Sequence, residues 1–328
     1  MDVQNAFVVT VTIYSALAIL SLLKSFHHEA RPFFVTDLTP TKCWIEYGNP
    51  SGHSVTSTAL YLTMWNLLCR RYRPTTYWRV VSLLMTIVVI LCIATSRLYN
   101  GVHTYNQILL GWILGVAIYY LYCHALYKEI CMFVRNTHRK QWITLAFNKG
   151  TIVFYSCYAL ACFNMLYGNT LHPVPQEWLA NIKKNCPNAN EMDLDAEKDN
   201  FKRFNVALSI IGSYIGLILE QRYIGTRKYK HFYQTSWYIT LARLIICTLV
   251  GSPTLCGMFL FPKKGYNWLI TLFMRMIIPM TLGNCYLFAM SKYVGKAFCT
   301  INTSIVDHTE SEEDLDIHVN DIFRQKQE

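Results

Sequence analysis

Apolar blocks of about 20 residues recur along the chain, and they limit its fold more than any other feature. A helix of that length crosses the hydrocarbon core of a bilayer. Only 15% of the 328 residues are charged and 53% are hydrophobic, whereas a soluble domain carries about 25% charged residues. We therefore predict an all-α integral membrane protein, a polytopic bundle of about eight transmembrane helices. The predicted spans are 5–23, 53–69, 78–96, 105–126, 150–167, 204–221, 236–258 and 267–290.

Basic residues in three loops indicate how the chain is oriented in the membrane. The net charge is +10, but the basic residues are not interleaved with aromatic ones as on a nucleic-acid surface, so we expect no nucleic-acid partner. They concentrate in the loops after the second, fourth and sixth spans, which the positive-inside rule places in the cytosol. The loops 24–52, 97–104, 168–203 and 259–266 are then lumenal. The basic residues concerned are Arg70, Arg71, Arg73, Arg79, Lys128, Arg135, Arg139, Lys140, Arg222, Arg227, Lys228 and Lys230.

The segments outside the spans lead to four further expectations. The loop 168–203 is polar and has little to bury, so we expect it to be partly ordered at most. The acidic stretch "DHTESEEDLD" after Phe298 is expected to be a solvated cytosolic tail. The dibasic pattern of Arg324 and Lys326 resembles a retrieval signal, which favours the endoplasmic reticulum or another endomembrane. Cys43 and Cys186 both lie on the lumenal side, which allows but does not require a disulfide between them.

Three polar segments lie at the ends of apolar blocks on the predicted lumenal side. Each sits where lipid meets water, and together they hold cations, histidines and one helix-breaking turn. Pro50 and Gly52 form that turn at the start of the second span. The segments are "KSFHHEARP" with Lys24 and Arg31, "PSGH" with Ser51, Gly52 and His53, and "SRLYNGVH" with Arg97 and His103.

Two arginines, one lysine and two histidines, taken without acidic partners, describe a site for a doubly charged anion. Guanidinium groups bind phosphate oxygens in a fork, and an ammonium adds a point charge. The unpaired N–H groups at the start of a helix also attract phosphate. Gly52 lets the backbone come close to the anion, and Ser51 can either cap the helix or donate to the anion. One histidine can attack phosphorus while the other protonates the leaving oxygen, so the chemistry needs no metal and no cofactor.

Each segment alone has a simpler interpretation. "PSGH" can be a turn that enters a helix, Lys24 and Arg31 can anchor the chain by extending to lipid headgroups, and His27 and His28 are expected to be solvated. The combined spacing argues otherwise. Lys24-x6-Arg31-Pro32, Pro50-Ser51-Gly52-His53 and Ser96-Arg97-x5-His103 resemble the three signature motifs of the type 2 phosphatidic acid phosphatase superfamily, which includes lipid phosphate phosphatases and glucose-6-phosphatases. The motifs cover residues 24–107.

The resemblance implies a role for each motif residue. His103 would be the nucleophile and His53 the general acid for the leaving group. The remaining motif positions would bind the substrate phosphate. These phosphate-binding residues are Lys24, Arg31, Ser51, Gly52 and Arg97.

The chain departs from the superfamily pattern in two ways. The third motif usually has Asp four residues after its histidine, and here that position is Gln107. Gln107 can orient the imidazole of His103, or it can form a helix capping box with Thr104. The six-helix superfamily core also has two helices before the first motif, whereas one span precedes Lys24 here. Glucose-6-phosphatases resemble this chain in both respects.

The resulting expectation is a metal-independent membrane phosphatase that hydrolyses a phosphate monoester on the non-cytosolic face. Residues 1–127 would form the catalytic core, 128–298 further transmembrane helices, and 299–328 the cytosolic tail. Its partners would be membrane lipids and a phosphorylated substrate, with a lipid phosphate favoured because such substrates are common in the superfamily. A sugar phosphatase and a non-catalytic membrane subunit remain the alternatives. The sequence leaves the oligomeric state open.

Overall fold

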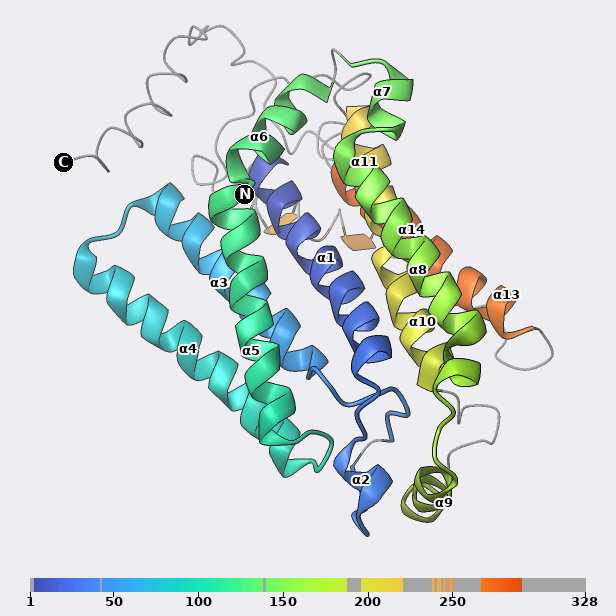
Figure 1. The fold of residues 1–328 in the computed structure, drawn as a ribbon. Coiled ribbons are helices and arrows are strands. Elements are labelled where there is room, and N and C mark those ends of the chain that lie inside the picture. Colours follow the sequence, from blue (N-terminus) through green and yellow to red (C-terminus); the bar gives the residue numbers. More distant parts are fainter. Residues whose placement is uncertain are drawn as a thin grey trace, which may run out of the picture.

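A computed structural model describes residues 3–41, 43–137, 140–187, 196–220 and 267–290, with isolated positions between 238 and 249. Within these ranges every regular element is helical. Figure 1 shows the long helices side by side along one direction, with short helices at both ends of the bundle. The predicted all-α membrane fold is therefore confirmed.

The first long helices form the part of the bundle that positions the site. They are α1 (Val3–His27), α3 (Gly52–Tyr72), α4 (Thr76–Tyr99) and α5 (Tyr105–Tyr120), and the short α2 (Pro32–Val35) follows α1. Gly111 and Gly115 bring α5 very close to α3: a Cβ on Gly111 would lie 2.8 Å from the Cβ of Ser54, and one on Gly115 would lie 2.6 Å from the Cβ of Thr58. The start of α5 is thereby held against the start of α3.

The rest of the described chain adds helices around this group. Figure 1 shows α8, α10 and α11 along the side of α1 that faces away from α4. The elements are η1 (Leu121–Ala125), α6 (Tyr127–Asn136), α7 (Trp142–Ala146), α8 (Lys149–Leu171), α9 (Gln176–Asn185), α10 (Ala196–Ala207), α11 (Ile210–Leu219), α13 (Trp268–Leu272), η6 (Phe273–Ile277), α14 (Ile278–Cys285) and η7 (Tyr286–Met290), where η marks a π-helical turn.

Among the described residues, six helical segments are long and apolar enough to cross a membrane, so the predicted number of eight is not confirmed. One difference is α3, which is helical over the predicted span 53–69 but carries several polar residues. It packs against α1, α4 and α5, and Ser54, Thr58 and Thr63 are buried in the protein. These polar side chains face other helices, where no apolar surface toward lipid is needed, which explains the composition of α3. The span predicted at 236–258 lies outside the described residues except for isolated helical positions.

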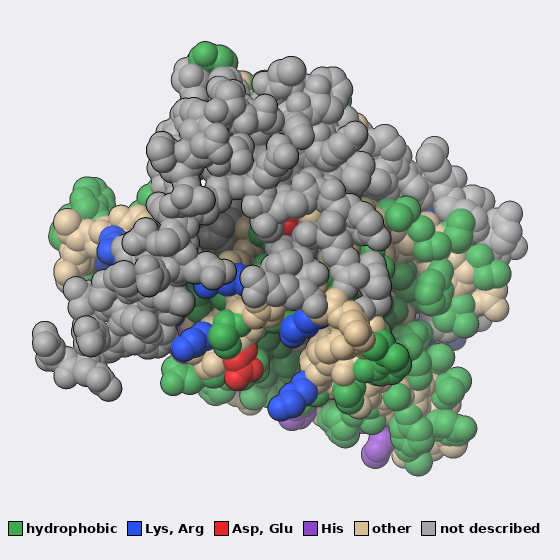
Figure 2. Space-filling view, turned by 90° about the horizontal axis from the view of Figure 1, so that it is seen from above, with side chains coloured by type: hydrophobic (Ala, Val, Ile, Leu, Met, Phe, Trp, Pro, Cys, Tyr) green, Lys and Arg blue, Asp and Glu red, His purple; other side chains and the backbone are tan. Residues whose placement is uncertain are grey.

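The motif-bearing helix ends gather at one end of the bundle. The end of α1, the start of α3, the end of α4 and the start of α5 all lie at the lower end in Figure 1, together with α2 and α9. Figure 2 views the opposite end and shows several Lys and Arg side chains in its described part.

The described parts of the loop 168–203, which we expected to be partly ordered at most, are largely helical. α8 continues to Leu171, α9 lies within the loop, and α10 begins at Ala196. Ile182 and Cys186 pack in one apolar cluster with Phe33 and Phe34. The order has a physical cause, because a segment of few apolar residues becomes ordered when it can pack on a core formed elsewhere.

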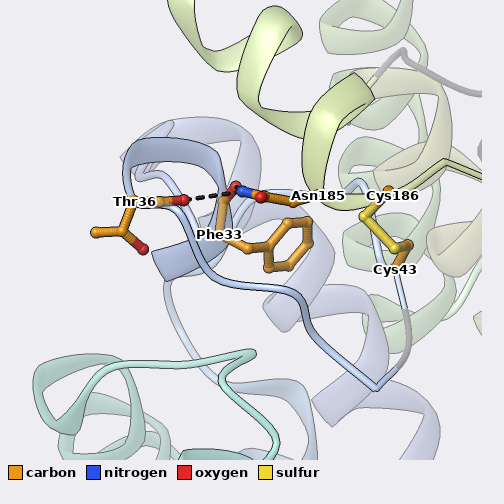
Figure 3. The surroundings of a disulfide bond; sticks show 5 residues. All are labelled: Phe33, Thr36, Cys43, Asn185 and Cys186. Carbon is orange, nitrogen blue, oxygen red and sulfur yellow. Dashed lines mark hydrogen bonds between the residues drawn. A yellow bond between two sulfur atoms is a disulfide. The ribbon is translucent and has the colours of Figure 1, made fainter.

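A disulfide joins this loop to the segment between α2 and α3. Cys43 and Cys186 are bonded, with Cα atoms 6.0 Å apart. Beside the disulfide, Asn185 Nδ2 donates to the backbone oxygens of Phe33 at 2.9 Å and Thr36 at 2.8 Å, and Figure 3 shows these residues together. The disulfide that the sequence left open is present, and it fixes α9 against the segment that leads to the "PSGH" turn.

Candidate active site

Short connections around the helix ends place the motif residues. Lys24 lies in the last turn of α1, and Arg31 lies just before α2 in an extended conformation, as expected for a residue that precedes proline. His53 is the second residue of α3. Arg97 lies in the last turn of α4, and His103 lies two residues before α5.

The buried guanidinium of Arg31 joins the first motif to the third. Its Nε donates to the backbone oxygen of Glu46 at 2.8 Å, and its Nη1 donates to the backbone oxygen of Val102 at 2.9 Å. Nη1 also lies 3.2 Å from Nε2 of His103. The resemblance implied that Arg31 and His103 belong to the same site. They are 72 residues apart in the sequence, and the structure brings them into direct contact.

The hydrogen-bond network assigns the tautomer of His103. Gln107 Nε2 lies 2.9 Å from both Glu29 Oε1 and the backbone oxygen of Ala30, and both of these atoms can only accept. Gln107 therefore turns its Oε1 toward His103, where it lies 3.0 Å from Nδ1. Because Oε1 can only accept, Nδ1 carries the proton. The lone pair of Nε2 is then free to accept from Arg31 or to attack an electrophile.

Gln107 also serves the helix capping box that the sequence offered as the alternative. Thr104 N donates to Gln107 Oε1 at 3.3 Å, and Gln107 N donates to Thr104 Oγ1 at 3.4 Å. The two interpretations of Gln107 are therefore compatible, because one carbonyl oxygen accepts from both the imidazole and the backbone. The cap fixes the side chain that orients His103.

Glu29 links this group to the turn before α3. Its Oε2 accepts from Asn49 Nδ2 at 2.6 Å, and its backbone oxygen accepts from Gly48 N at 2.8 Å. A Cβ on Gly48 would lie 2.5 Å from Gln107 Nε2, so any larger residue there would displace the amide that contacts Glu29. Ser51 N donates to the backbone oxygen of Gln107 at 2.9 Å. The segment 46–52 is thus held against both Glu29 and the start of α5.

Glu46 lies among the cations, so the expectation that they have no acidic partner was wrong. Its Oε1 lies 3.2 Å from Lys24 Nζ and 2.6 Å from Arg31 Nη2. Its Oε2 contacts Nε of Arg203, which comes from α10. Lys24 also donates to the backbone oxygen of Tyr47 at 2.5 Å. Buried charges need partners, and Lys24 and Arg31 are buried too deeply to use water.

The charges shift the pKa values of the two titratable groups in the loops. Burial by itself would raise the pKa of Glu46, but the charges of Lys24, Arg203 and Arg31 outweigh burial and lower it. Burial lowers the pKa of His103 well below its usual value, and the charges of Arg31 and Lys24 lower it further, while the hydrogen bond with Gln107 acts in the opposite direction. His103 is therefore neutral, and Glu46 is charged, at neutral pH.

The second motif lies beside this cluster. His53 is exposed and interacts electrostatically with Arg97, Arg203 and Arg31, and His103 interacts electrostatically with His53. Ser51 does not cap α3 through its side chain. Its Oγ instead accepts from Ser54 at 3.0 Å.

Arg97 is only loosely joined to the cluster. Its Nε and Nη2 donate to the hydroxyl of Ser96 at 3.1 and 3.0 Å. The connection to the other motif residues is its electrostatic interaction with His53.

Residues 5–131 match the family model of the PAP2 superfamily, the superfamily of type 2 phosphatidic acid phosphatases. This segment belongs to the PAP2 superfamily. Comparison with curated proteins and with solved structures gave no match. The resemblance inferred from the motif spacing is thereby confirmed. The match contains every residue from Lys24 to Gln107, and it ends in α6.

Three charged residues near the PAP2 site were missed from the sequence. Glu29 lies two residues before Arg31, and Glu46 lies five residues before Ser51. Their closeness to the motifs in the sequence was a usable signal. Arg203 lies outside the PAP2 segment, and nothing in its neighbourhood in the sequence marks it. Among the described residues, no group of three or more His, Cys, Asp or Glu side chains could hold a metal ion.

The histidines next to the first motif differ from each other. His27 is exposed, as expected. His28 is partly buried, with its Nε2 3.2 Å from Glu197 Oε1 and its ring 4.4 Å from the ring of His172. The expectation that His28 is solvated was therefore wrong, because α10 brings a carboxylate to it.

Proposed function

We propose that this chain hydrolyses phosphate monoesters through a phosphohistidine at His103. PAP2 proteins are generally phosphatases, and the tautomer of His103 is the observation that supports this proposal best. Gln107 holds the proton on Nδ1, so the Nε2 lone pair points toward the cations. A neutral imidazole with a fixed ring and a free nitrogen is what nucleophilic attack on phosphorus needs.

The reaction divides into two steps. In the first, His103 Nε2 forms a bond to phosphorus, the ester P–O bond breaks, and the imidazolium form of His53 gives its proton to the leaving oxygen, which leaves His53 neutral. In the second, water attacks phosphorus, the N–P bond breaks, and His53 takes up a proton from that water. Inorganic phosphate leaves, and both histidines return to their starting states.

Cations in the site stabilise the charge of the transferring phosphoryl group. Arg31 Nη1 donates toward Nε2 of His103, so a phosphate oxygen that replaces Nε2 as the acceptor brings phosphorus to the nucleophile. Fixed positive groups in a site shielded from water stabilise the transition state without reorganising. Once His103 is phosphorylated, its ring becomes cationic. The side chain of Gln107 then connects this ring to the carboxylate of Glu29, whose negative charge stabilises it.

Our first substrate candidate is a lipid phosphate on the lumenal face of an endomembrane, with the tail from 299 in the cytosol. A site at the ends of membrane-crossing helices suits a headgroup that stays at the surface of the bilayer. A soluble sugar phosphate is the second candidate. It is favoured because a single described helix, α1, precedes the first motif, and helices beyond the PAP2 segment, such as α10, reach the site.

The test uses the purified full-length chain in nanodiscs with EDTA present. Phosphatidate, sphingosine 1-phosphate, glucose 6-phosphate and p-nitrophenyl phosphate would be compared, and the phosphoenzyme would be trapped from a radiolabelled substrate. We expect hydrolysis with vanadate inhibition, and a phosphoenzyme that is stable to alkali and labile to acid. Activity that disappears with EDTA and returns with Mg²⁺ would overturn the mechanism. No hydrolysis and no phosphoenzyme from any of these esters would favour a non-catalytic membrane subunit.

A further inference from the structure

Arg203 reaches the site from outside the PAP2 segment. Its Nε contacts Glu46 Oε2, and its guanidinium carbon lies 4.8 Å from the centre of the Trp44 ring. An ideal Cβ on Gly52 would lie 4.0 Å from Nη1 of Arg203. The guanidinium therefore faces the first residue of α3, where the unpaired backbone N–H groups of a helix start attract anions.

Arg203 is more accessible than the two motif cations. Its side chain is 26% exposed, whereas those of Lys24 and Arg31 are 0% and 2% exposed. Arg31 also gives most of its N–H groups to Glu46, Val102 and His103. A phosphate that enters from solvent therefore meets Arg203 before it meets the buried pair.

The carboxylate of Glu46 bridges all three cations. One oxygen contacts Lys24 and Arg31, and the other contacts Arg203. A phosphate group can also present two oxygens to neighbouring cations, and guanidinium groups frequently bind both kinds of anion through two parallel hydrogen bonds. Lys24, Arg31 and Arg203 outnumber the nearby carboxylates of Glu46 and Asp199, so the cluster keeps an excess of positive charge that a phosphate can balance.

We propose that Arg203 is a phosphate-binding residue of this site, and that the substrate's phosphate takes over the contacts that Glu46 makes with Arg203 and Arg31. The proposal rests on the proposed function for the nature of the anion. It adds a helix from beyond the PAP2 segment to the binding site. It also makes Glu46 an internal competitor, so the affinity for phosphate depends on how readily that carboxylate moves aside.

The experiment compares Arg203→Gln and Arg203→Lys in the full-length protein. Lys202→Gln is the matched control, because Lys202 is the neighbouring cation on α10 and pairs with Asp199 at 2.8 Å instead. KM for p-nitrophenyl phosphate, the inhibition constant of vanadate and the rise in Tm with inorganic phosphate would be measured. For Arg203→Gln we expect KM and the vanadate constant to rise roughly 10- to 100-fold, the range for a lost hydrogen bond to a charged group, with a smaller change in kcat. Arg203→Lys should recover part of the loss, because an ammonium keeps the charge but not the fork.

Glu46→Gln tests the competition. If phosphate displaces the carboxylate, this variant should bind vanadate more tightly than the wild type and gain more Tm from phosphate. Weaker vanadate binding in a Glu46→Gln protein that still melts cooperatively would overturn this half of the proposal. It would show that the carboxylate holds the cations in place for phosphate.

The outcomes also distinguish a failure of the Arg203 proposal from a failure of the phosphatase proposal. An Arg203→Gln protein with unchanged KM, vanadate constant and phosphate-induced Tm would refute the role of Arg203 and leave the phosphatase proposal intact. A wild type that hydrolyses no ester, yet gains Tm from phosphate only when Arg203 is present, would support the binding site and contradict the phosphatase proposal. An equal loss in Lys202→Gln would show that the effect is not specific to Arg203 and would refute its role.

Discussion

Gln107 donates from its amide to Glu29 Oε1 at 2.9 Å, and with its other end it orients the nucleophile candidate. The chain therefore has an amide and a carboxylate in series where the superfamily pattern has one Asp. The charge lies one residue further from the imidazole, and it also holds Asn49. The cationic ring of a phosphorylated His103 can therefore be stabilised by Glu29, although the residue at position 107 is neutral.

Replacing Glu29 by Gln tests this arrangement. The variant removes the charge behind Gln107 while keeping the size of the side chain. We expect kcat to fall roughly tenfold, equivalent to about 1.4 kcal/mol, with little change in KM, because Glu29 reaches His103 only through Gln107. The exposed Glu177→Gln on α9 is the control. A rise in KM at constant kcat would mean that Glu29 supports binding rather than the nucleophile.

Gln107→Asp should lower activity on its own, although Asp is the usual residue at this position. An aspartate at position 107 would face the Glu29 carboxylate and would lose the two donors that now contact Glu29 and Ala30. In the double variant Glu29→Gln, Gln107→Asp the repulsion disappears, so we expect activity above that of either single variant. A double-mutant cycle on kcat measures the coupling. Additive losses would contradict a direct connection between the two residues.

As the pH is lowered, kcat/KM should begin to fall only below pH 6.5; we call this fall the acid limb of the pH profile. His103 must be neutral to attack, and its pKa in the folded protein is well below its usual value of about 6.5. Activity is then retained as the pH falls through 6.5 and is lost only when the pH reaches the lowered pKa. By the same sign, protonation of His103 favours the unfolded chain below about pH 6.5.

A charge variant shows whether His103 sets that limb. The charge of Lys24 lowers the pKa of His103, so Lys24→Gln should move the limb to higher pH. A pH profile with p-nitrophenyl phosphate measures it, since this leaving group barely needs a proton from His53. A limb at or above 6.5 in the wild type, or one that Lys24→Gln leaves in place, would refute this assignment.

The two histidines should respond differently to the leaving group. His103→Ala should abolish turnover and the phosphoenzyme with every ester, because no other described nucleophile is in contact with Arg31. His53→Ala should lose roughly 10²- to 10⁴-fold on alkyl phosphates, the usual contribution of general acid catalysis, and recover in part on p-nitrophenyl phosphate. Rapid-quench measurement of the phosphoenzyme separates the two steps. If His53→Ala lacks the phosphoenzyme while His103→Ala keeps it, the roles are reversed.

The disulfide should stabilise the site end of the bundle. Cys43→Ser with Cys186→Ser removes the bond between α9 and the segment before Trp44, a loss that costs about 2–5 kcal/mol in small secreted domains. We expect a lower Tm and a higher KM, because Glu46 and Trp44 follow directly after Cys43. Cys92→Ser on α4 is the control, since Cys92 is a free cysteine on the membrane-facing helix. An unchanged Tm and KM would show that the packing of Ile182 is sufficient to hold α9.

The sequence predicted those features of the site that depend on spacing within one segment. Lys24, Arg31, His53 and His103 could be found because the motifs keep a fixed distance from their helix ends, and those ends meet in the bundle. The membrane class followed from the length of the apolar blocks. Both signals are local.

Features that depend on packing between distant segments could not be found. Arg203 enters the site because α10 packs along α1, and no local pattern encodes that contact. The order of α9 depends on Phe33 and Phe34, which lie far away in the sequence. Polar residues lower the hydropathy of α3, and Ser54, Thr58 and Thr63 are tolerated there because they are buried against other helices.

The position of Arg203 in the chain has a consequence for biosynthesis. The PAP2 segment leaves the ribosome well before α10, and it can begin to assemble in the membrane while the later helices are still being made. Until α10 docks, Glu46 has Lys24 and Arg31 as its cationic partners, and no guanidinium faces the start of α3. A nascent chain could therefore complete the folding of its family segment without yet holding a substrate in the proposed way. The docking of α10 would then act as a checkpoint, so that chains truncated before Arg203 insert into the membrane but do not become competent.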